Sequence, residues 1–458
     1  MTEPKVRVHK FGGTSVETAE RLLRAARLLR TSPEAPVVVV SALAGVTDRL
    51  AALAEDPSRE ASVAMLKDLR TRHLGVATDL LGKESTSTPV GQRMGELLDA
   101  LEGSVTRAGQ EGKPVGRESE WRDAILAAGE DLSVLLMALA LARDGRKPRV
   151  MDARDMIRTE LRGGRAVPDD EATYPRILER ILPALGGGGV PVLQGFVAAS
   201  ASGITTNLGR GGSDFTAAIL GAALQAPVTI WTDVDGILSA DPRAVEAPRV
   251  LREMGYEEAV ELAYFGAKVI HPSAAKHAVA RKISLRIRNS FQGEDPGTLI
   301  RHDAREVPQV QAVAFRPGIT LVRVRSRPLF MVHGFLARVF RILARHRVPV
   351  DLVATSHTST AFTVDREDEF SPALPALEQL AEVEVHRHLA TVTVVGRGLL
   401  EQPGMSGRLL ESLGPIPIFL LSQASDVSLH LVVEGAQARE VVRRIHDTFV
   451  SNGTHPGG

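Results

Sequence analysis

Cysteine is absent from the 458 residues of this chain, and its formal charges cancel. Without cysteine there can be no disulfide framework, no thiol nucleophile and no cysteine-ligated metal. The 55 basic and 55 acidic residues sum to zero, which argues against binding nucleic acid or acidic membranes through a bulk electrostatic field. Any site for an anion must therefore be built locally, from a few residues.

Long apolar segments are missing as well. The longest uncharged apolar runs, residues 37–46 and 134–142, are too short to span a bilayer, and residues 1–10 hold no apolar segment of signal-peptide length. We therefore expect a cytoplasmic protein without a membrane partner. The length predicts two to four domains, and the 44% apolar and 24% charged residues are ordinary for a globular protein.

The first dense motif is K-F-G-G-T-S-V, at residues 10–16. It follows a short alternating segment that predicts a strand, and residues 17–30 place apolar side chains on one helical face. Gly12 and Gly13 let the backbone approach a ligand closely. Lys10 adds a positive charge beside helix amides, which favours a bound phosphate. The P-loop pattern is absent, and an ordinary turn between a strand and a helix explains the same residues.

A second strand and a later helix carry further polar candidates. Residues 35–40, which end in four valines, predict a strand buried on both faces, as in parallel sheets. Ser41 and Thr47 follow this strand, where ligands of open α/β sheets bind, although a helix cap would also explain them. Residues 124–142 predict an apolar helix with Glu130 near its start, where an acidic group can complement the helix dipole.

The second dense motif, T-T-N-L-G-R-G-G-S-D, occupies residues 205–214. Its three glycines allow several backbone amides to converge on an anion. The guanidinium of Arg210 offers a planar fork suited to a carboxylate or a phosphate. A plain glycine-rich loop would require neither Arg210 nor Asp214, so we favour a functional site here.

Residues 231–243 follow another apolar strand and contain the turn dipeptides Asp-Gly and Asp-Pro. They predict a loop at a strand end, where polar side chains could meet a nucleotide. Lys268 is a second candidate for binding phosphate, whereas His271, which precedes a proline, is interpreted as structural. His386 and His388 have no third ligand near them in the sequence, so we predict no metal site there.

Residues 293–309 mix glycine, proline and charges and predict a domain boundary. The pattern of predicted elements changes after them. Beyond this boundary, strands and helices follow one another in two β-α-β-β-α-β cycles, a pattern typical of ferredoxin-like modules. The prediction places separate strands at residues 382–387 and 390–395.

The motif at residues 10–16 resembles the opening signature of the aspartate kinases, in the amino-acid kinase superfamily. Three more blocks match at family spacing, at residues 208–214, 231–243 and 265–272. The resemblance implies an α/β protein with a three-layer amino-acid kinase fold and a mainly parallel sheet, followed by two ferredoxin-like ACT domains. The implied domains are residues 1–300, 310–387 and 388–450, with interleaving of the two ACT domains as an alternative.

The family's motifs also imply roles for single residues. Those implied to bind the nucleotide are Lys10, Phe11, Gly12, Gly13, Thr232, Asp233, Leu238, Arg243, Lys268 and Val269. Those implied to bind aspartate are Ser41, Thr47, Glu130, Arg210, Gly211, Gly212 and Ser213. Glu130 would take the ammonium group and Arg210 the α-carboxylate. The residues implied to serve catalysis are Lys10, Arg210, Asp214 and Lys268.

Two positions depart from the family pattern: Leu238 stands where related enzymes often have tyrosine, and Asn207 where threonine is common. The implied reaction is phosphorylation of the L-aspartate side chain by ATP, which gives 4-phospho-L-aspartate and begins lysine, threonine and methionine biosynthesis. The acceptor carboxylate is ionised at pH 7, so positioning and charge, including Mg²⁺ held mainly by the phosphates, suffice. The alternatives are another amino-acid kinase, of glutamate, N-acetylglutamate or carbamate type, and an inactive effector-binding regulator.

The layout is similar to that of single-chain, lysine-sensitive aspartate kinases, which implies L-lysine as an effector and a homodimer or tetramer formed through the ACT domains. The matching effector positions are Leu329, Val332, Phe335, Leu336, Val350, Asp351, Ser356 and His357. Asp351 would pair with a cationic effector. Met331 stands where a relative would offer histidine, and His357 where glutamate is usual, which would weaken lysine binding or shift the effector to threonine.

Overall fold

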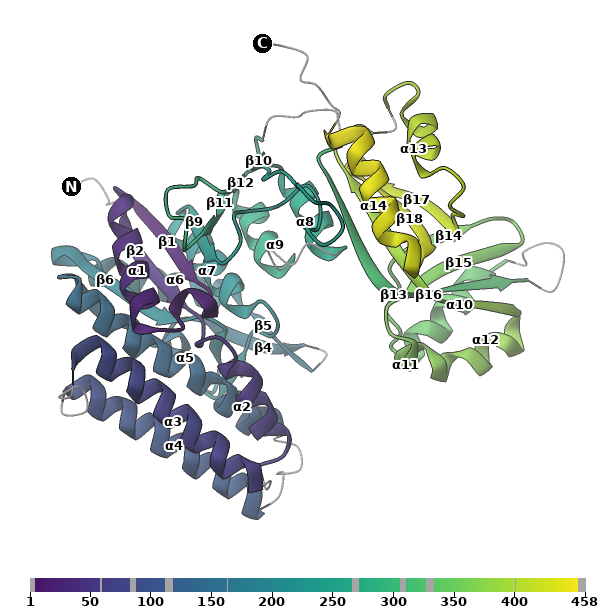
Figure 1. Ribbon diagram of the computed structural model, residues 1–458. Helices are drawn as coiled ribbons and strands as arrows, with labels where there is room; N and C mark the ends of the chain where they lie inside the picture. The colour runs from purple at the N-terminus through teal and green to yellow at the C-terminus, as the bar shows by residue number, and fades with distance from the viewer. Residues whose placement is uncertain are drawn as a thin grey trace, which may run out of the picture. The chain divides into compact units, whose positions relative to one another are not determined.

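The computed structural model divides the chain into two compact units, and Figure 1 shows their elements. It describes residues 5–57, 60–82, 88–111, 118–162, 164–265, 272–304, 310–326, 333–399 and 401–451. The first unit contains the described residues of Met1–Ile237, Arg252–Tyr256 and Val269–Ala304. The second contains those of Leu238–Leu251, Glu257–Lys268 and Arg305–Gly458.

An eight-stranded sheet forms the centre of the first unit, in the order β10-β12-β11-β9-β1-β2-β6-β3. Its inner strands pair in parallel, while β11 and β12 pair antiparallel. A parallel sheet covered on both faces requires strands that are apolar throughout, which explains the continuous apolar runs in the sequence. The strands are β1 Val6–Phe11, β2 Ala35–Val40, β3 Lys147–Val150, β6 Gly189–Gln194, β9 Val228–Thr232, β10 Glu253–Met254, β11 Leu285–Asn289 and β12 Thr298–Ile300.

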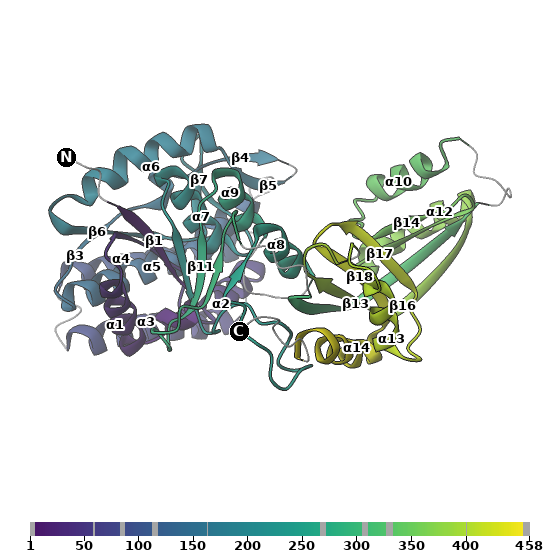
Figure 2. The ribbon, with the colours of Figure 1, turned by 90° about the horizontal axis from the view of Figure 1, so that it is seen from above.

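Helices cover both faces of this sheet (Figure 2). Helix α5 packs against α1, α2, α3 and α4 on one face, and α7 packs against α6 and α9 on the other. The predicted three-layer α/β fold with a mainly parallel sheet is therefore confirmed. The helices are α1 Ala19–Leu28, α2 Val46–Glu55, α3 Glu60–Leu81, α4 Pro89–Glu111, α5 Glu118–Arg143, α6 Asp170–Ala184, α7 Gly212–Leu224 and α9 Pro272–Arg281.

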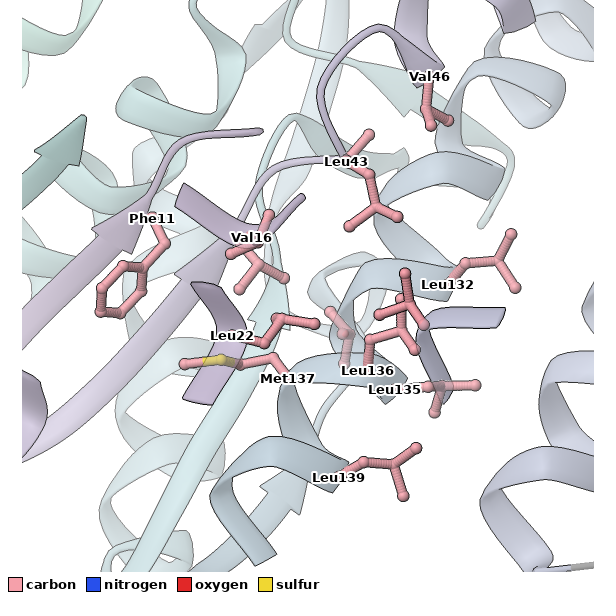
Figure 3. Close-up of a cluster of buried hydrophobic side chains, with 14 of the residues drawn as sticks. Phe11, Val16, Leu22, Leu43, Val46, Leu132, Leu135, Leu136, Met137 and Leu139 are labelled. Carbon is pink, nitrogen blue, oxygen red and sulfur yellow. The ribbon is translucent and has the colours of Figure 1, made fainter. Parts of the chain in front are cut away.

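Helix α5 is the core helix of the first unit. The stretch Glu120–Arg143 is long and apolar enough to cross a membrane by length and composition, but 83% of its most apolar window is buried inside the protein. Figure 3 shows leucines of α5 in one cluster with Leu22 of α1 and with Leu43 and Val46. Burying each such side chain contributes roughly 1.5–3 kcal/mol, so this cluster fixes the segments around the candidate site.

A four-stranded sheet in the same unit, in the order β5-β4-β7-β8, leads into the second glycine motif. Strand β7 follows β6 after a two-residue turn, and β8 ends three residues before Arg210. The strands are β4 Arg158–Arg162, β5 Arg165–Pro168, β7 Val197–Ser200 and β8 Thr205–Asn207.

The second unit is built on one six-stranded antiparallel sheet, in the order β14-β15-β13-β16-β18-β17. Its strands are β13 Ala312–Arg325, β14 Val353–Thr355, β15 Ser359–Val364, β16 Glu382–Val395, β17 Leu420–Ser425 and β18 Ser428–Glu434. Its helices are α10 Phe335–Arg345, α11 Glu367–Phe370, α12 Leu374–Leu380, α13 Met405–Leu413 and α14 Ala438–His446, together with most of α8 Tyr256–Tyr264.

Both predicted ACT modules share strands β13 and β16. The second half of β13 packs in a core with α10 and α12, whereas Val313 from its first half packs with α13 and α14. The prediction of two separate strands at residues 382–387 and 390–395 was wrong, because both segments pair with β13, across a register shift at Ile319, and form the single strand β16. His388, with a φ of 61°, marks the point where this long strand is kinked.

Candidate active site

The carboxyl ends of β1, β2, β6 and β9 lie at one edge of the parallel sheet, where open α/β sheets bind ligands. Lys10 is the last but one residue of β1, and Ser41 directly follows β2. Gln194 ends β6, and Thr232 ends β9. The structure therefore brings predicted site residues from distant parts of the sequence to the same edge.

Lys10 and Asp214 join the two dense motifs of the sequence. Lys10 is only 9% exposed, and its Nζ lies 2.7 Å from Oδ1 of Asp214 in the first turn of α7. A charged group inside a protein is costly unless it is paired, so this ion pair holds the first glycine turn against the second glycine motif. The two motifs thus belong to a single site.

The glycine turn after β1 is constrained by its neighbours. The amide of Gly12 donates to the carbonyl of Trp231 (2.9 Å). A Cβ on Gly13 would lie 2.7 Å from the carbonyl oxygen of Ala42, so only glycine fits there. The amides of Gly13 and Thr14 open a short 3-10 turn and have no acceptor within the described part of the chain. These amides, rather than that of Gly12, are the ones that a phosphate could use.

Phe11 does not contact a nucleotide through its side chain, because that ring is fully buried in the core (Figure 3). It stacks on Trp231 with ring centroids 6.0 Å apart. The indole of Trp231 donates to Nδ1 of His9 (3.2 Å), and burial lowers the pKa of His9 to about 3, so this imidazole stays neutral. The main-chain carbonyl of Phe11 accepts from the amide of Ser41 (3.1 Å), and a role of Phe11 in nucleotide binding stays a prediction.

Ser41 and Thr47 flank the tight segment between β2 and α2. Gly45 turns the chain with a φ of 73° before α2 begins, and the amide of Ala44 donates to the carbonyl of Gly13 (3.2 Å). Ser41 is half-buried and Thr47 is exposed. The structure ties this segment to the first motif, and the contact of both hydroxyls with a substrate stays a prediction.

Glu130 lies in the middle of α5, not near its start, because the helix begins at Glu118. The side chain is 3% exposed, Oε1 accepts from the amide of Ala42 (3.1 Å), and Oε2 has no partner among the described residues. Burial raises the pKa of Glu130 to about 8, and Lys10 opposes that shift. The interpretation as a helix-dipole residue is therefore wrong, and Glu130 offers an unpaired oxygen beside the site.

Arg210 follows β8 in a loop of glycines. Gly209 and Gly211 have φ values of 75° and 70°, a conformation that other residues rarely adopt. Arg210 is exposed, and its guanidinium forms no ion pair with any residue that the structure describes. Gly211 caps α7, and Gly212 and Ser213 form its first residues. Their contact with a substrate stays a prediction.

Two residues of this region were missed in the sequence. Phe196, just after β6, has a φ of 68°, and its amide donates to the hydroxyl of Thr216 (3.0 Å). Such strain in a bulky residue gathers at functional sites, but no sequence pattern reports it. The other residue is Arg154, which bonds Asp131 beside Glu130.

Thr232 and Asp233, which are predicted to bind the nucleotide, lie at the end of β9 in the first unit. The hydroxyl of Thr232 donates to the carboxylate of Asp233 (3.1 Å), and its carbonyl accepts from the amide of Ser290 (2.8 Å). Asp233 is exposed. Thr232 and Asp233 thus lie at the same edge of the sheet as Lys10.

Four further residues predicted to bind the nucleotide lie in the second unit or outside the described residues. Leu238 and Arg243 lie in the second unit, where Arg243 is bonded to Asp241 (2.6 Å). Lys268 and Val269 lie outside the described residues. Their roles in catalysis and nucleotide binding stay predictions.

Asp351, the predicted partner of a cationic effector, is already bonded on both oxygens. Oδ2 accepts from Arg316 (2.6 Å), and Oδ1 accepts from the hydroxyl of Tyr264. The side chain of Asp351 is only 5% exposed, and Val350 before it is half-buried. Arg316 also pairs with Asp365 (2.8 Å). An effector could reach Asp351 only by displacing one of these partners.

The other described effector positions also lie in the second unit. Gly334, with a φ of 82°, caps α10, and Phe335 is buried in the first module's core while Leu336 is half-buried. Ser356 and His357 lie in the exposed turn between β14 and β15. Outside the described residues lie Leu329, Met331 and Val332.

Comparison with known proteins gives family matches in both parts of the chain. The model of the amino acid kinase family matches residues 5–289, and an ACT domain model matches residues 392–449. The chain is 34% identical over 452 residues to lysine-sensitive aspartokinase 3 of Escherichia coli strain K12, covering 96% of this chain and 98% of that protein. Two crystal structures of E. coli aspartokinase III, each 34% identical, cover 97% of this chain and 99% of theirs. The TM-score is 0.85 for the R-state complex with aspartate and ADP and 0.80 for the T-state complex with lysine and aspartate.

Proposed function

The chain belongs to the aspartokinases of the amino acid kinase family, and we propose that it transfers the terminal phosphoryl group of ATP to the side chain of L-aspartate. The family, the fold class and the class of phosphotransferase predicted from the residues are confirmed by these matches. The finer assignment of residues is supported by one observation above all. Lys10 pairs with Asp214 and acts electrostatically on Glu130, whose Oε2 has no partner among the described residues. Arg210, four residues before Asp214, is exposed and forms no ion pair in the described part of the chain.

Each of these groups has a chemical task. Glu130 receives the ammonium group of aspartate, and the fork of Arg210 receives the α-carboxylate. The aspartate side chain, ionised at pH 7, then attacks the γ-phosphorus, and the bond from that phosphorus to the bridging oxygen of ADP breaks. Lys10 stabilises charge on the transferred group. Since the acceptor is already deprotonated, positioning and charge stabilisation carry the reaction.

Mg²⁺ is expected to accompany ATP, held mainly through the phosphates. This ion prefers oxygen ligands and usually takes one or two carboxylates besides the phosphates, and the exposed carboxylate of Asp233 at the end of β9 fits that requirement. When bound, Mg²⁺ would neutralise phosphate charge. The chain's own residues position the two substrates.

The regulatory and cellular aspects of the function rest on the similarity to lysine-sensitive relatives. We infer that L-lysine inhibits this enzyme through the ACT modules, with Asp351 as the acidic contact. A homodimer or tetramer formed through these modules, and a cytoplasmic location, complete the proposal. The extended strands β13 and β16, which run through both modules, supply a single sheet on which such regulation could act.

Coupled release of ADP by the purified chain tests the proposal. We expect turnover with L-aspartate and trapping of the acyl phosphate by hydroxylamine. Rates should be roughly 10- to 200-fold lower with glutamate, whose extra methylene displaces the side-chain carboxylate, and lower still with N-acetylglutamate, which lacks the ammonium group that Glu130 is proposed to receive. Turnover of another amino acid in preference to aspartate would contradict it. The absence of turnover with any of them would instead indicate an inactive regulator.

A further inference from the structure

Arg154 forms several hydrogen bonds beside the candidate site, to Asp131 and to Thr205. It lies in a 3-10 turn, Ala153–Asp155, that follows β3. Its guanidinium binds both oxygens of Asp131 on α5, from Nη1 at 2.9 Å and from Nη2 at 2.8 Å. The side chains of Arg154 and Asp131 are 20% and 14% exposed. This two-pronged geometry fixes direction as well as distance.

Gln194 completes the hold on Asp131 from the end of β6. Its Nε2 donates to Oδ1 of Asp131 (2.8 Å), and its Oε1 accepts from the amide of Ala153 (2.9 Å). Gln194 is 5% exposed. Asp131 is therefore held by both Arg154 and Gln194, and Glu130 is the residue before it on the same helix.

Arg154 also bonds the strand that leads to Arg210. Its Nε donates to the hydroxyl of Thr205 (2.9 Å), the first residue of β8. This strand runs directly into the loop that carries Arg210. A second bond between α5 and β8, from Asn207 to the carbonyl of Asp123 (3.0 Å), is independent of Arg154.

We propose that Arg154 is a positioning residue that sets the separation between Glu130 and Arg210 and thereby the affinity for aspartate; this inference rests on the proposed function. Arg154 binds both elements that carry the proposed substrate contacts. It binds α5 at Asp131, one residue after Glu130, and β8 at Thr205, which leads into the loop of Arg210. A displacement of about 1 Å at a reacting group can lower the rate ~100-fold. Loss of the bonds of Arg154 should therefore weaken the use of aspartate, because Glu130 and Arg210 would no longer be held at the right separation. The nucleotide side, built on Lys10 and Thr232, has no contact with Arg154 among the described residues.

Kinetics of Arg154→Lys and Thr205→Val test the proposal, with aspartate and ATP varied separately. Lysine keeps the charge but loses the fork, and valine keeps the shape of threonine without its hydroxyl. We expect the KM for aspartate to rise roughly 10- to 100-fold in Arg154→Lys and less in Thr205→Val. The KM for ATP should stay within about twofold. Arg158→Lys is the matched control, because Arg158 bonds the carbonyl of Ser200 (3.2 Å) in the same sheet.

The same variants are checked for folding, so that a loss of aspartate affinity is not confused with unfolding. Circular dichroism and thermal unfolding confirm that each variant is folded, and Thr205→Val keeps the test valid if Arg154→Lys unfolds. A KM for aspartate within twofold of wild type in the folded variants, or an equal rise in the KM for ATP, would overturn the proposal. If the wild-type enzyme fails to turn over aspartate, the proposed function fails. Calorimetric binding of aspartate then decides, since weaker binding in the variants supports positioning and equal binding refutes it.

Discussion

At the residue scale, the buried carboxyl group of Glu130 makes aspartate binding a proton-linked event. In the free enzyme burial raises the pKa of Glu130 to about 8, so roughly nine-tenths of these groups are neutral at pH 7. A substrate ammonium beside the carboxylate favours its charged form and lowers this pKa. Aspartate binding near pH 7 should therefore release close to one proton per site, and the affinity should rise from about pH 6 to about pH 8.

Titration calorimetry in buffers of different ionisation heat counts these protons. The variant Glu130→Gln is the control, because it keeps the shape of the side chain but has no proton to release, and it should bind aspartate weakly. Heats that are identical in all buffers for the wild-type enzyme would contradict the assignment of Glu130 to the ammonium group.

Lys10 is predicted to be needed for turnover and, through Asp214, for stability. Lys10→Met should lower kcat ~100- to 1000-fold, because one preorganised charge-stabilising group is lost. It also leaves the carboxylate of Asp214, 15% exposed, without its partner, which should cost about 3–5 kcal/mol of unfolding free energy.

The double variant Lys10→Met with Asp214→Asn separates the two effects. Removing the unpaired charge should restore most of the stability in chemical denaturation, while kcat stays as low as in Lys10→Met. A folded Lys10→Met enzyme within threefold of wild-type kcat would exclude Lys10 from the catalytic machinery.

At the scale of elements, the first glycine turn fits closely against the segment after β2. Gly13→Ala would place a Cβ 2.7 Å from the carbonyl of Ala42, so we expect a loss of about 1–3 kcal/mol of stability together with a lower kcat. Gly75→Ala is the matched control: no atom lies within 4 Å of its added Cβ, and within α3 it should stabilise by about 0.5–1 kcal/mol. Urea unfolding and steady-state kinetics of both variants measure the difference. Equal effects of the two substitutions would show that the turn has room to move.

The same elements show what a sequence can predict. The central strands and the two glycine motifs were predictable, because apolar runs and strand–glycine–helix order are local patterns. The position of Glu130 within α5 was not, since the polar residues from Glu118 gave no helix signal as strong as the apolar run. The junction at Arg154 was missed because its partners Asp131 and Thr205 are brought to it only by the fold.

At the scale of the whole molecule, part of the region matched by the kinase family belongs to the unit that carries the ACT sheet. Residues 257–265 lie in the second unit. There Glu258 accepts from Arg397 (3.3 Å), Glu261 accepts from Ser428 (3.0 Å), and Tyr264 bonds Asp351. Helix α8 is thus held on the regulatory sheet by side chains along its length. We therefore expect a ligand that changes this sheet to act on a segment that the kinase family model matches.

Tyr264 gives the proposed lysine regulation a measurable signature. Because Asp351 already accepts from Tyr264 and Arg316, a lysine ammonium must compete for this carboxylate. Tyr264→Phe removes one competitor, a hydrogen bond to a charged group worth about 1.5–3 kcal/mol, and should lower the half-inhibitory lysine concentration about tenfold or more. Asp351→Ala should abolish inhibition and keep basal activity.

Lysine titrations of the kinase assay, repeated with threonine and methionine, check this prediction. Tyr174→Phe is the matched control, since the hydroxyl of Tyr174 bonds Asp170 in the first unit, and it should leave the lysine response unchanged. A wild-type enzyme that ignores lysine at millimolar levels would remove lysine as the effector. A responsive wild-type enzyme whose Tyr264→Phe variant responds identically, or less strongly, would show instead that lysine binds without displacing Tyr264 from Asp351.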